Sequence, residues 1–325
     1  MRQNRFVRAS RLEQQLARIG DLRKGPPDAV REELRALLGN RSQHIVAKAA
    51  QAAGVLQLIE LDGELRDAFE RFFANPLVND PRTVALTEIV KALVALEAQA
   101  DSVYLRGMRH RQFDSMSGDT AIDMRSQSGI GLARSGYSAA PLELAEMLRD
   151  EAPHCRASAA RALAACDPAA AEPLLRFKAL AGDPEPAVLE ECLSALLEIN
   201  PEGSLVFVKR FLASGDLASA ESAAMALGGC RHSEALAVLT AEWRRRNERQ
   251  LRRAILLAIA TMRRDQAIEF LLATVAREDP GDARDAIFAL RLHREDEKIR
   301  ARLREVVETR GDRGLEEVFH GAFPL

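Results

Sequence analysis

A run of arginines is the part of the sequence whose chemistry best suits binding another molecule. Six arginines lie within ten residues, directly after the only tryptophan, Trp243. Guanidinium groups hold phosphates and an indole ring can stack on a base, so the pattern favours an acidic or nucleic-acid partner. The alternative is a turn between helices, with arginine stems packed on neighbours and Trp243 in the core. The six residues are Arg244, Arg245, Arg246, Arg249, Arg252 and Arg253.

A second group of polar residues lies between 107 and 125. Arg109, His110, Asp119 and Arg125 would meet on one rim if the segment joining their helices brought them together. That arrangement would form a polar contact site for a partner. The simpler interpretation is a histidine at a helix end and Asp119 as the N-cap of the next helix.

No pattern of catalytic residues accompanies these groups. The sequence contains no His-Glu-x-x-His zinc motif, no phosphate-binding glycine loop and no Gly-x-Ser-x-Gly elbow. Gly129 and Gly131 lie within a predicted helix and follow no strand, which excludes a dinucleotide loop. We therefore predict no catalytic residue, no cofactor and no metal site.

The cysteines and the composition indicate an intracellular location. Cys155, Cys166, Cys192 and Cys230 form no Cys-x-x-Cys pair, and such thiols are typical of a reducing compartment. The formal net charge of −2 gives no overall preference for nucleic acid or for membranes. No apolar run approaches the ~18 residues needed to span a bilayer. The sequence therefore predicts a cytoplasmic protein without a membrane partner.

The elements that must position these residues follow a repeat. Five short stretches carry a small residue at positions 162, 195, 226, 258 and 289, in steps of 33, 31, 32 and 31 residues. A period of 20–50 residues indicates stacked supersecondary units rather than one closed core. Earlier equivalents at Ala52, Ala92 and Gly131 are spaced more widely, so the extra length around 107–120 predicts a loop at an irregular unit.

Helical spacing of apolar residues, with proline between the segments, predicts about eight helix pairs. The fold class is therefore all-α, an α-solenoid. We expect a capping helix within residues 1–25 and a continuous array over 26–310. Within that array the unit 100–135 is irregular and the repeats 139–293 are regular, and a C-terminal cap or tail follows at 311–325.

The stretch from Leu148 to Ala164 resembles the HEAT repeat of short bacterial type, similar to the repeat of phycobilisome lyases. The turn 183–188 resembles the turn within such a repeat, although Leu189 stands where that pattern usually has arginine. The block with Gly107, Arg109, His110, Asp119, Thr120 and Arg125 also resembles one in bacterial HEAT-repeat proteins. The resemblance implies a helical-repeat fold over about residues 25–310 and no particular activity.

The favoured function is a non-enzymatic scaffold that binds another protein along the face made by the second helices. Its expected contact residues are Arg109, His110, Asp119, Arg125 and Arg156, and the alternative role of Arg156 is a ladder bond to a neighbouring repeat. Nucleic acid is the less favoured partner. In that alternative the chain is a nucleic-acid-binding or alkylated-DNA-repair protein of HEAT-like type that uses the basic cluster Arg244–Arg253.

Overall fold

The protein is an all-α chain of stacked helix pairs, as the repeat predicted. The structure is a computed structural model and describes residues 27–230 and 232–324, so the expected helix within 1–25 lies outside the described residues. The chain divides into two compact units, one ending at Ala171 and one beginning at Glu172. Each unit is described by itself, and one continuous array over 26–310 stays a prediction.

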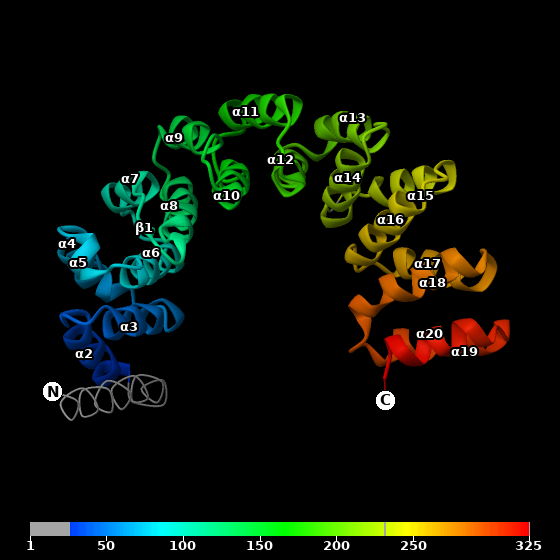
Figure 1. Cartoon of the computed structure of the whole chain (residues 1–325), viewed down its shortest axis with the longest axis horizontal. Coiled ribbons are helices and arrows are strands. Elements are labelled where there is room, and N and C mark those ends of the chain that lie inside the picture. The colour runs from blue at the N-terminus through cyan, green and yellow to red at the C-terminus, as the bar shows by residue number, and fades with distance from the viewer. Residues whose placement is uncertain (1–26, 231, 325) are drawn as a thin grey trace. The chain divides into compact units, whose positions relative to one another are not determined.

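The first unit contains four helix pairs and a small hairpin (Figure 1). Its second helices α3, α6, α8 and α10 pack on one another in chain order. The bounds of its elements are α2 Pro27–Leu38, α3 Gln43–Val55, η2 Ile59–Leu61, α4 Asp62–Phe73, α5 Pro76–Asn79, α6 Val84–Ala95, α7 Asp101–Arg109, β1 Phe113–Asp114, β2 Gly118–Asp119, α8 Ile122–Arg134, α9 Ala140–Met147 and α10 Pro153–Leu163.

The second unit continues the same plan. The helix α11, Pro168–Ala181, runs across the division, and the remaining elements are α12 Pro186–Ile199, α13 Pro201–Leu212, α14 Leu217–Gly229, α15 Ala235–Arg245, α16 Arg249–Thr261, α17 Asp265–Arg277, α18 Pro280–Leu290, η3 Arg291–His293, α19 Glu297–Arg310 and α20 Arg313–Ala322. In Figure 1 the second helices α14 and α16 form one layer, and the first helices α13 and α15 form the other.

Proline and short polar side chains start several of these helices, as the sequence indicated. Pro201 and Pro280 occupy first-turn positions, where the missing N–H is no loss. The Asn200 side chain accepts a hydrogen bond from Gly203 N at 3.0 Å, and Asp279 accepts one from Gly281 N at 2.8 Å. These caps satisfy backbone donors that a helix leaves unpaired.

The C-terminal segment 311–325, expected as a cap or tail, contains the helix α20. Leu315 and Phe319 on this helix are buried, and α20 packs against α18 and α19. Asp312 caps its first turn by accepting a hydrogen bond from Gly314 N at 2.9 Å. This helix therefore covers the apolar face that α18 would otherwise expose, which is what a terminal repeat must do.

The small residue of each second helix is buried, as the repeat predicted. Ala162, Ala195, Ala226 and Ala258 are at most 4% exposed. Gly131 of α8 lies against the Tyr104 ring of α7, where an added Cβ would come within 2.5 Å of Cε1. At Gly131 the small residue therefore permits close approach of the paired helices, whereas Ala92 and Ala258 lie against Gly54 and Gly228 of the preceding second helices.

Candidate functional site

The residues 107–125 form a hairpin that is held by one buried arginine. Arg125 is 1% exposed, and its guanidinium contacts Asp119 of β2 at 2.7 Å. The same group donates to both carboxylate oxygens of Asp150, at 3.0 and 3.2 Å, and to the carbonyl oxygen of His110 at 3.2 Å. Arg125 thus connects the hairpin to the turn before α10, and all three nitrogens of its guanidinium make contacts.

The carboxylates around Arg125 are held in their ionised form. Burial alone would raise the pKa of Asp150, but the backbone N–H of Ala152 and the Arg125 guanidinium outweigh it and lower the pKa. Burial likewise opposes the ionised form of Asp119, and the Arg125 hydrogen bond again lowers its pKa. The cluster is a buried ion network, and its charges stabilise one another.

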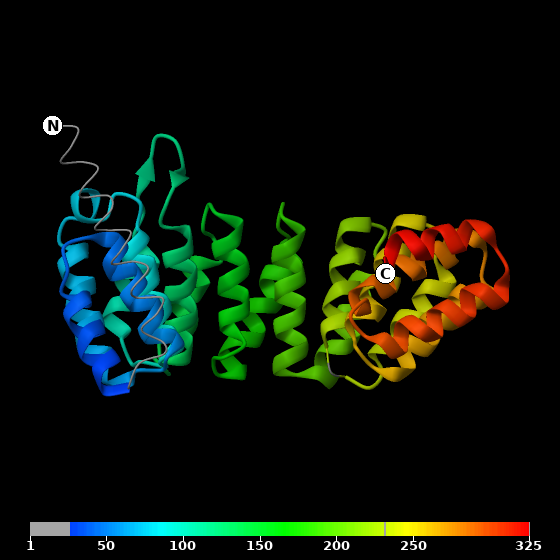
Figure 2. The same ribbon diagram turned by 90° about the horizontal axis from the view of Figure 1, so that it is seen from below.

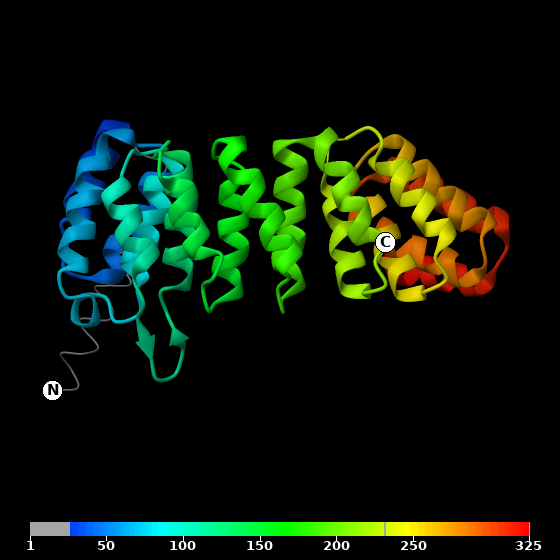
Figure 3. The same cartoon turned by 90° about the horizontal axis from the view of Figure 1, so that it is seen from above.

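A second buried contact fixes the base of the hairpin. Gln112 is 2% exposed and donates from Nε2 to the carbonyl oxygen of Asp80 at 2.8 Å. The Asp80 carboxylate accepts hydrogen bonds from the backbone N–H groups of Val84 and Leu86, both at 2.8 Å. Figures 2 and 3 show the hairpin extending beyond the ends of the neighbouring helices of the first unit. Its tip carries Met116, which is 94% exposed.

The expected contact site over 107–125 needs correction because the structure gives these residues different environments. The role of Arg125 as a surface contact is wrong, since its side chain is buried among carboxylates. Asp119 is 13% exposed and also belongs to that network. It lies in β2 rather than at the N-cap of α8, which is Ala121. Only Arg109 remains well exposed, and it pairs with Glu143 at 2.6 Å.

His110 and Arg156 also make intramolecular contacts. His110 shares a hydrogen bond with Gln112 at 3.0 Å, and its ring lies 5.0 Å from the Phe73 ring. Arg156 donates to the carbonyl oxygens of Asp150 and Glu151 at 2.8 and 3.0 Å, which satisfies the turn that precedes its own helix. A cleft of about 820 Å³ between α7 and α9 contains Arg109, Arg111 and Arg149, and a carboxylate contacts each of them.

Most arginines of the run make contacts within the protein. Arg246 is 8% exposed and donates to the carbonyl oxygens of Leu212 and Ser214, at 3.1 and 2.7 Å. Arg252 donates to the carbonyl oxygen of Trp243 at 2.6 Å and pairs with Asp282 of α18. These two side chains therefore join consecutive repeats, which is the structural alternative that the sequence left open.

The remaining arginines of the run divide into two kinds. Arg245 pairs with Glu242 at 2.5 Å, and Arg249 reaches Asp285 of α18 at 3.5 Å. Arg244 and Arg253 are exposed and have no hydrogen-bond or carboxylate partner among residues 27–230 and 232–324. The basic patch therefore offers two unpaired cations rather than six.

Trp243 cannot stack on a base. It is 2% exposed, its ring meets Phe270 edge-on at 5.5 Å, and the Arg252 guanidinium covers it at 3.9 Å. The interpretation of Trp243 as a core residue is confirmed. The only indole in the sequence is therefore not available to stack on a base.

Burial disfavours the thiolate of Cys166 and Cys192. Burial raises the pKa of Cys192 to about 12 and that of Cys166 to about 11, which keeps both groups protonated near neutral pH. Within the described part of the chain, no three His, Cys, Asp or Glu side chains gather as a metal site would require. No helix in the same residues is long and apolar enough to cross a membrane.

A row of apolar side chains on the second-helix face of the second unit was missed by the sequence analysis. Leu257 and Phe288 are 38% and 36% exposed, and each directly precedes the small residue of its helix. Met225 holds the equivalent, partly exposed position on α14. The first two line a depression of about 310 Å³, together with Glu221, Gln250, Arg253, Ala254, Asp285 and Ala289. We call Met225, Leu257 and Phe288 the apolar row.

The signal for this row was present in the sequence. The residue before the small position is Arg161 in one repeat, Ser194 in the next, and then apolar in three successive repeats. When a surface position changes from polar to apolar over consecutive repeats, that part of the surface is indicated as an interaction site. The repeat fixes the position, but only the structure shows that it stays exposed.

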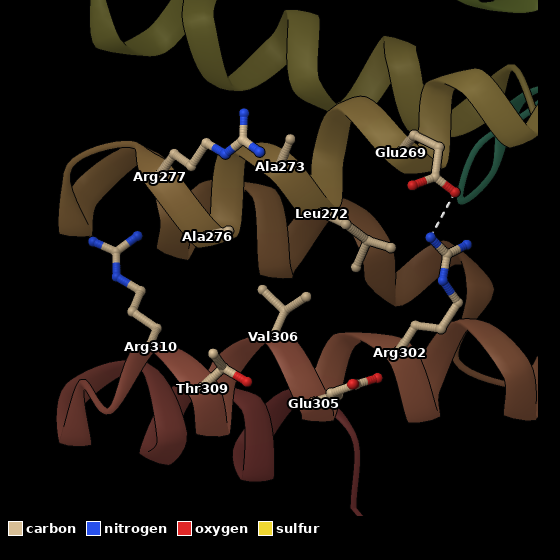
Figure 4. Close-up of a pocket in the computed structure, with 10 residues that line it drawn as sticks. All are labelled: Glu269, Leu272, Ala273, Ala276, Arg277, Arg302, Glu305, Val306, Thr309 and Arg310. Atoms are coloured by element: carbon tan, nitrogen blue, oxygen red, sulfur yellow. Dashed lines mark hydrogen bonds and ion pairs between the residues drawn. The ribbon is translucent and has the colours of Figure 1, made fainter.

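A groove of about 550 Å³ between α17 and α19 has a partly apolar floor that includes Leu272 and Val306 (Figure 4). Two of its three arginines already serve the fold. Arg302 pairs with Glu269 at 2.5 Å across the groove, and Arg310 donates to the carbonyl oxygen of Val275 near the end of α17. It is therefore a weaker candidate than the apolar row.

Comparison with known proteins gives a likeness only at the level of helical-repeat structures. No protein-family model matches the sequence, and no curated protein is significantly similar to it. A solved complex of CpcE and CpcF of phycocyanin lyase from Nostoc sp. PCC7120 aligns at 16% identity with a TM-score of 0.38, over 86% of this chain and 93% of that one. An engineered protein aligns at 17% identity with a TM-score of 0.38, over 94% and 95%. Neither likeness assigns a family or an activity to this chain.

Proposed function

We propose that the protein is a non-enzymatic scaffold that binds another protein through its second-helix face. The observation that carries this proposal is the apolar row, whose members Leu257 and Phe288 stay exposed at equivalent positions of consecutive repeats. Exposed apolar side chains that continue from one repeat to the next are typical of interaction surfaces. The polar groups that could have performed chemistry are instead used within the fold.

The proposal is tested by affinity purification from native cell extract, with and without nuclease. We expect a defined protein at fixed stoichiometry that is retained after nuclease treatment and lost from a Leu257→Ser/Phe288→Ser variant. Val206→Ser is the matched control, because Val206 is 69% exposed on the first-helix layer of the same unit. Partners that disappear with nuclease would instead support nucleic-acid binding. Retention of no protein at all would refute the scaffold.

A further inference from the structure

We infer that the second-helix face of the second unit is a docking site for an acidic amphipathic helix that lies across α14, α16 and α18. This inference rests on the proposed scaffold function and names the chemistry of its partner. The site consists of the apolar row, two unpaired arginines and one unsatisfied carboxylate oxygen. Each of these features constrains a different property of the occupant.

The spacing of the apolar row favours a helix over an extended strand. Consecutive packed helices lie about 8–10 Å apart, so the apolar row repeats at roughly that interval. Seven residues of an α-helix rise about 10.5 Å and return to nearly the same face. In a strand, residues i and i+3 are also about 10 Å apart, but their side chains point to opposite faces because side chains alternate along a strand. Only a helix therefore presents one apolar residue to each helix of the row.

The charges beside the row favour an acidic occupant. Arg253 lies one turn before Leu257 on α16, and Arg284 lies one turn before Phe288 on α18. Both arginines are exposed, and neither has a hydrogen-bond or carboxylate partner in the part of the chain that the structure describes. Arg249, by contrast, is already paired with Asp285. Two unpaired cations that flank an apolar row are complementary to carboxylates along the edge of a docked helix.

Glu221 indicates how the docked helix is oriented on the site. This residue lines the same depression from α14, and its Oε1 is buried without a hydrogen-bond donor among the described residues. A buried acceptor without a donor is costly, so a donor from the occupant would relieve it. The docked helix would then place its carboxylates over α16 and α18 and a lysine or asparagine over α14.

The same depression disfavours nucleic acid. Glu221 and Asp285 both line it, and their carboxylates repel phosphates. Phe288 is the only aromatic ring among the residues that line the depression, and Trp243 is buried. An acidic helix avoids this repulsion because its carboxylates need to meet only the two arginines.

The test uses the full chain and a defined probe in fluorescence anisotropy. The probe is a labelled peptide of about three heptads, with leucine at every seventh position and glutamate on one flank. Its counterpart carries lysine in place of glutamate. We expect the acidic probe to bind wild-type protein, and its affinity to fall at least about tenfold in Arg253→Glu/Arg284→Glu and in Leu257→Ser/Phe288→Ser.

Two control variants show whether the effect is local. Arg244→Glu removes an exposed, unpaired arginine of α15, and Val206→Ser removes an exposed apolar residue of α13. Both should bind the acidic probe as wild-type protein does. If a charge-reversed variant fails to fold, Arg253→Gln/Arg284→Gln replaces it, and a fall in wild-type affinity with added salt supplies an independent measurement.

Several outcomes would overturn the inference. They are no binding of the acidic probe, equal binding of the lysine probe, unchanged binding after either double substitution, and displacement of the probe by single-stranded nucleic acid. Failure here is distinguishable from failure of the scaffold. A protein partner that is lost from Leu257→Ser/Phe288→Ser but retained by Arg253→Glu/Arg284→Glu in native extract would leave the scaffold function intact and reject the acidic helix.

Discussion

The backbone of Gly131 in α8 lies directly against the ring of Tyr104 in α7, and a Cβ on Gly131 would come within 2.5 Å of ring atom Cε1. Tyr104 is fully buried and donates from its hydroxyl to the carbonyl oxygen of Ala98 at 3.1 Å. The ring therefore has little room to retreat. The irregular third pair closes only because its second helix lacks a side chain at that position.

The first prediction concerns this contact. Gly131→Ala should destabilise the protein by about 1–3 kcal/mol, because overpacking must displace the Tyr104 ring or separate the two helices. Gly63→Ala is the matched control, since Gly63 lies in α4 and a Cβ there meets no atom within 4 Å. The control should be neutral or slightly stabilising, as alanine favours a helix. Chemical denaturation measures both, and equal stability of the two variants would contradict the contact.

The second prediction concerns the buried ion network. Arg125→Met should cost up to about 3–5 kcal/mol, because it removes the guanidinium that contacts Asp119 and leaves the buried Asp150 with Arg111 as its cation. The hairpin should also lose protection against hydrogen exchange at residues 113–120. Arg109→Met removes an exposed ion pair with Glu143 and should change stability by less than about 1 kcal/mol. Protection of the hairpin in Arg125→Met equal to that in wild-type protein would exclude the anchoring role.

The third prediction concerns acid. The folded pKa values of Asp119 and Asp150 lie below the ordinary 3.8, so these groups stabilise the fold above that pH. Their contribution is lost as the pH falls from about 4 through the folded pKa values. In Asp150→Asn, the free energy of unfolding should therefore depend less steeply on pH below 4.

The pKa of Asp80 shifts in the opposite direction, so its effect on stability must be separated from that of Asp150. Burial raises its pKa, so its contribution is greatest below 3.8 and is lost as the pH rises. The comparison is therefore made as the difference between Asp150→Asn and wild-type protein at each pH, since Asp80 is common to both. If the difference in the free energy of unfolding between the two proteins does not change with pH, Asp150 is not held ionised in the fold.

The fourth prediction concerns helix ends. Arg263 follows α16 with a φ of 50°, a left-handed conformation that costs a non-glycine residue about 1 kcal/mol. Arg263→Gly should therefore raise stability by about that amount. Gly136 lies at the corresponding place after α8 with a φ of 76° and open space around it, so Gly136→Ala should lower stability by a similar amount. Thermal unfolding tests both, and shifts of the same sign would reject this explanation.

The sequence by itself determined the repeat and the helices. The small residues of the second helices and the proline-marked helix starts follow from local conformation and from a period of about 32 residues. Both can be read without knowing the tertiary structure. The glycines of α8 also signalled close packing, because glycine within a helix has a conformational cost that some contact must offset.

Only the tertiary structure decided which polar residues are available for binding. The carboxylates that neutralise Arg252 and Arg249 are Asp282 and Asp285, which lie on the next second helix about thirty residues later. Asp150, the main partner of Arg125, lies beyond an entire intervening helix. Charges that are distant in sequence become neighbours when repeats stack, and a local pattern cannot show this. The same stacking leaves Leu257 and Phe288 exposed on consecutive helices and so creates the proposed docking surface.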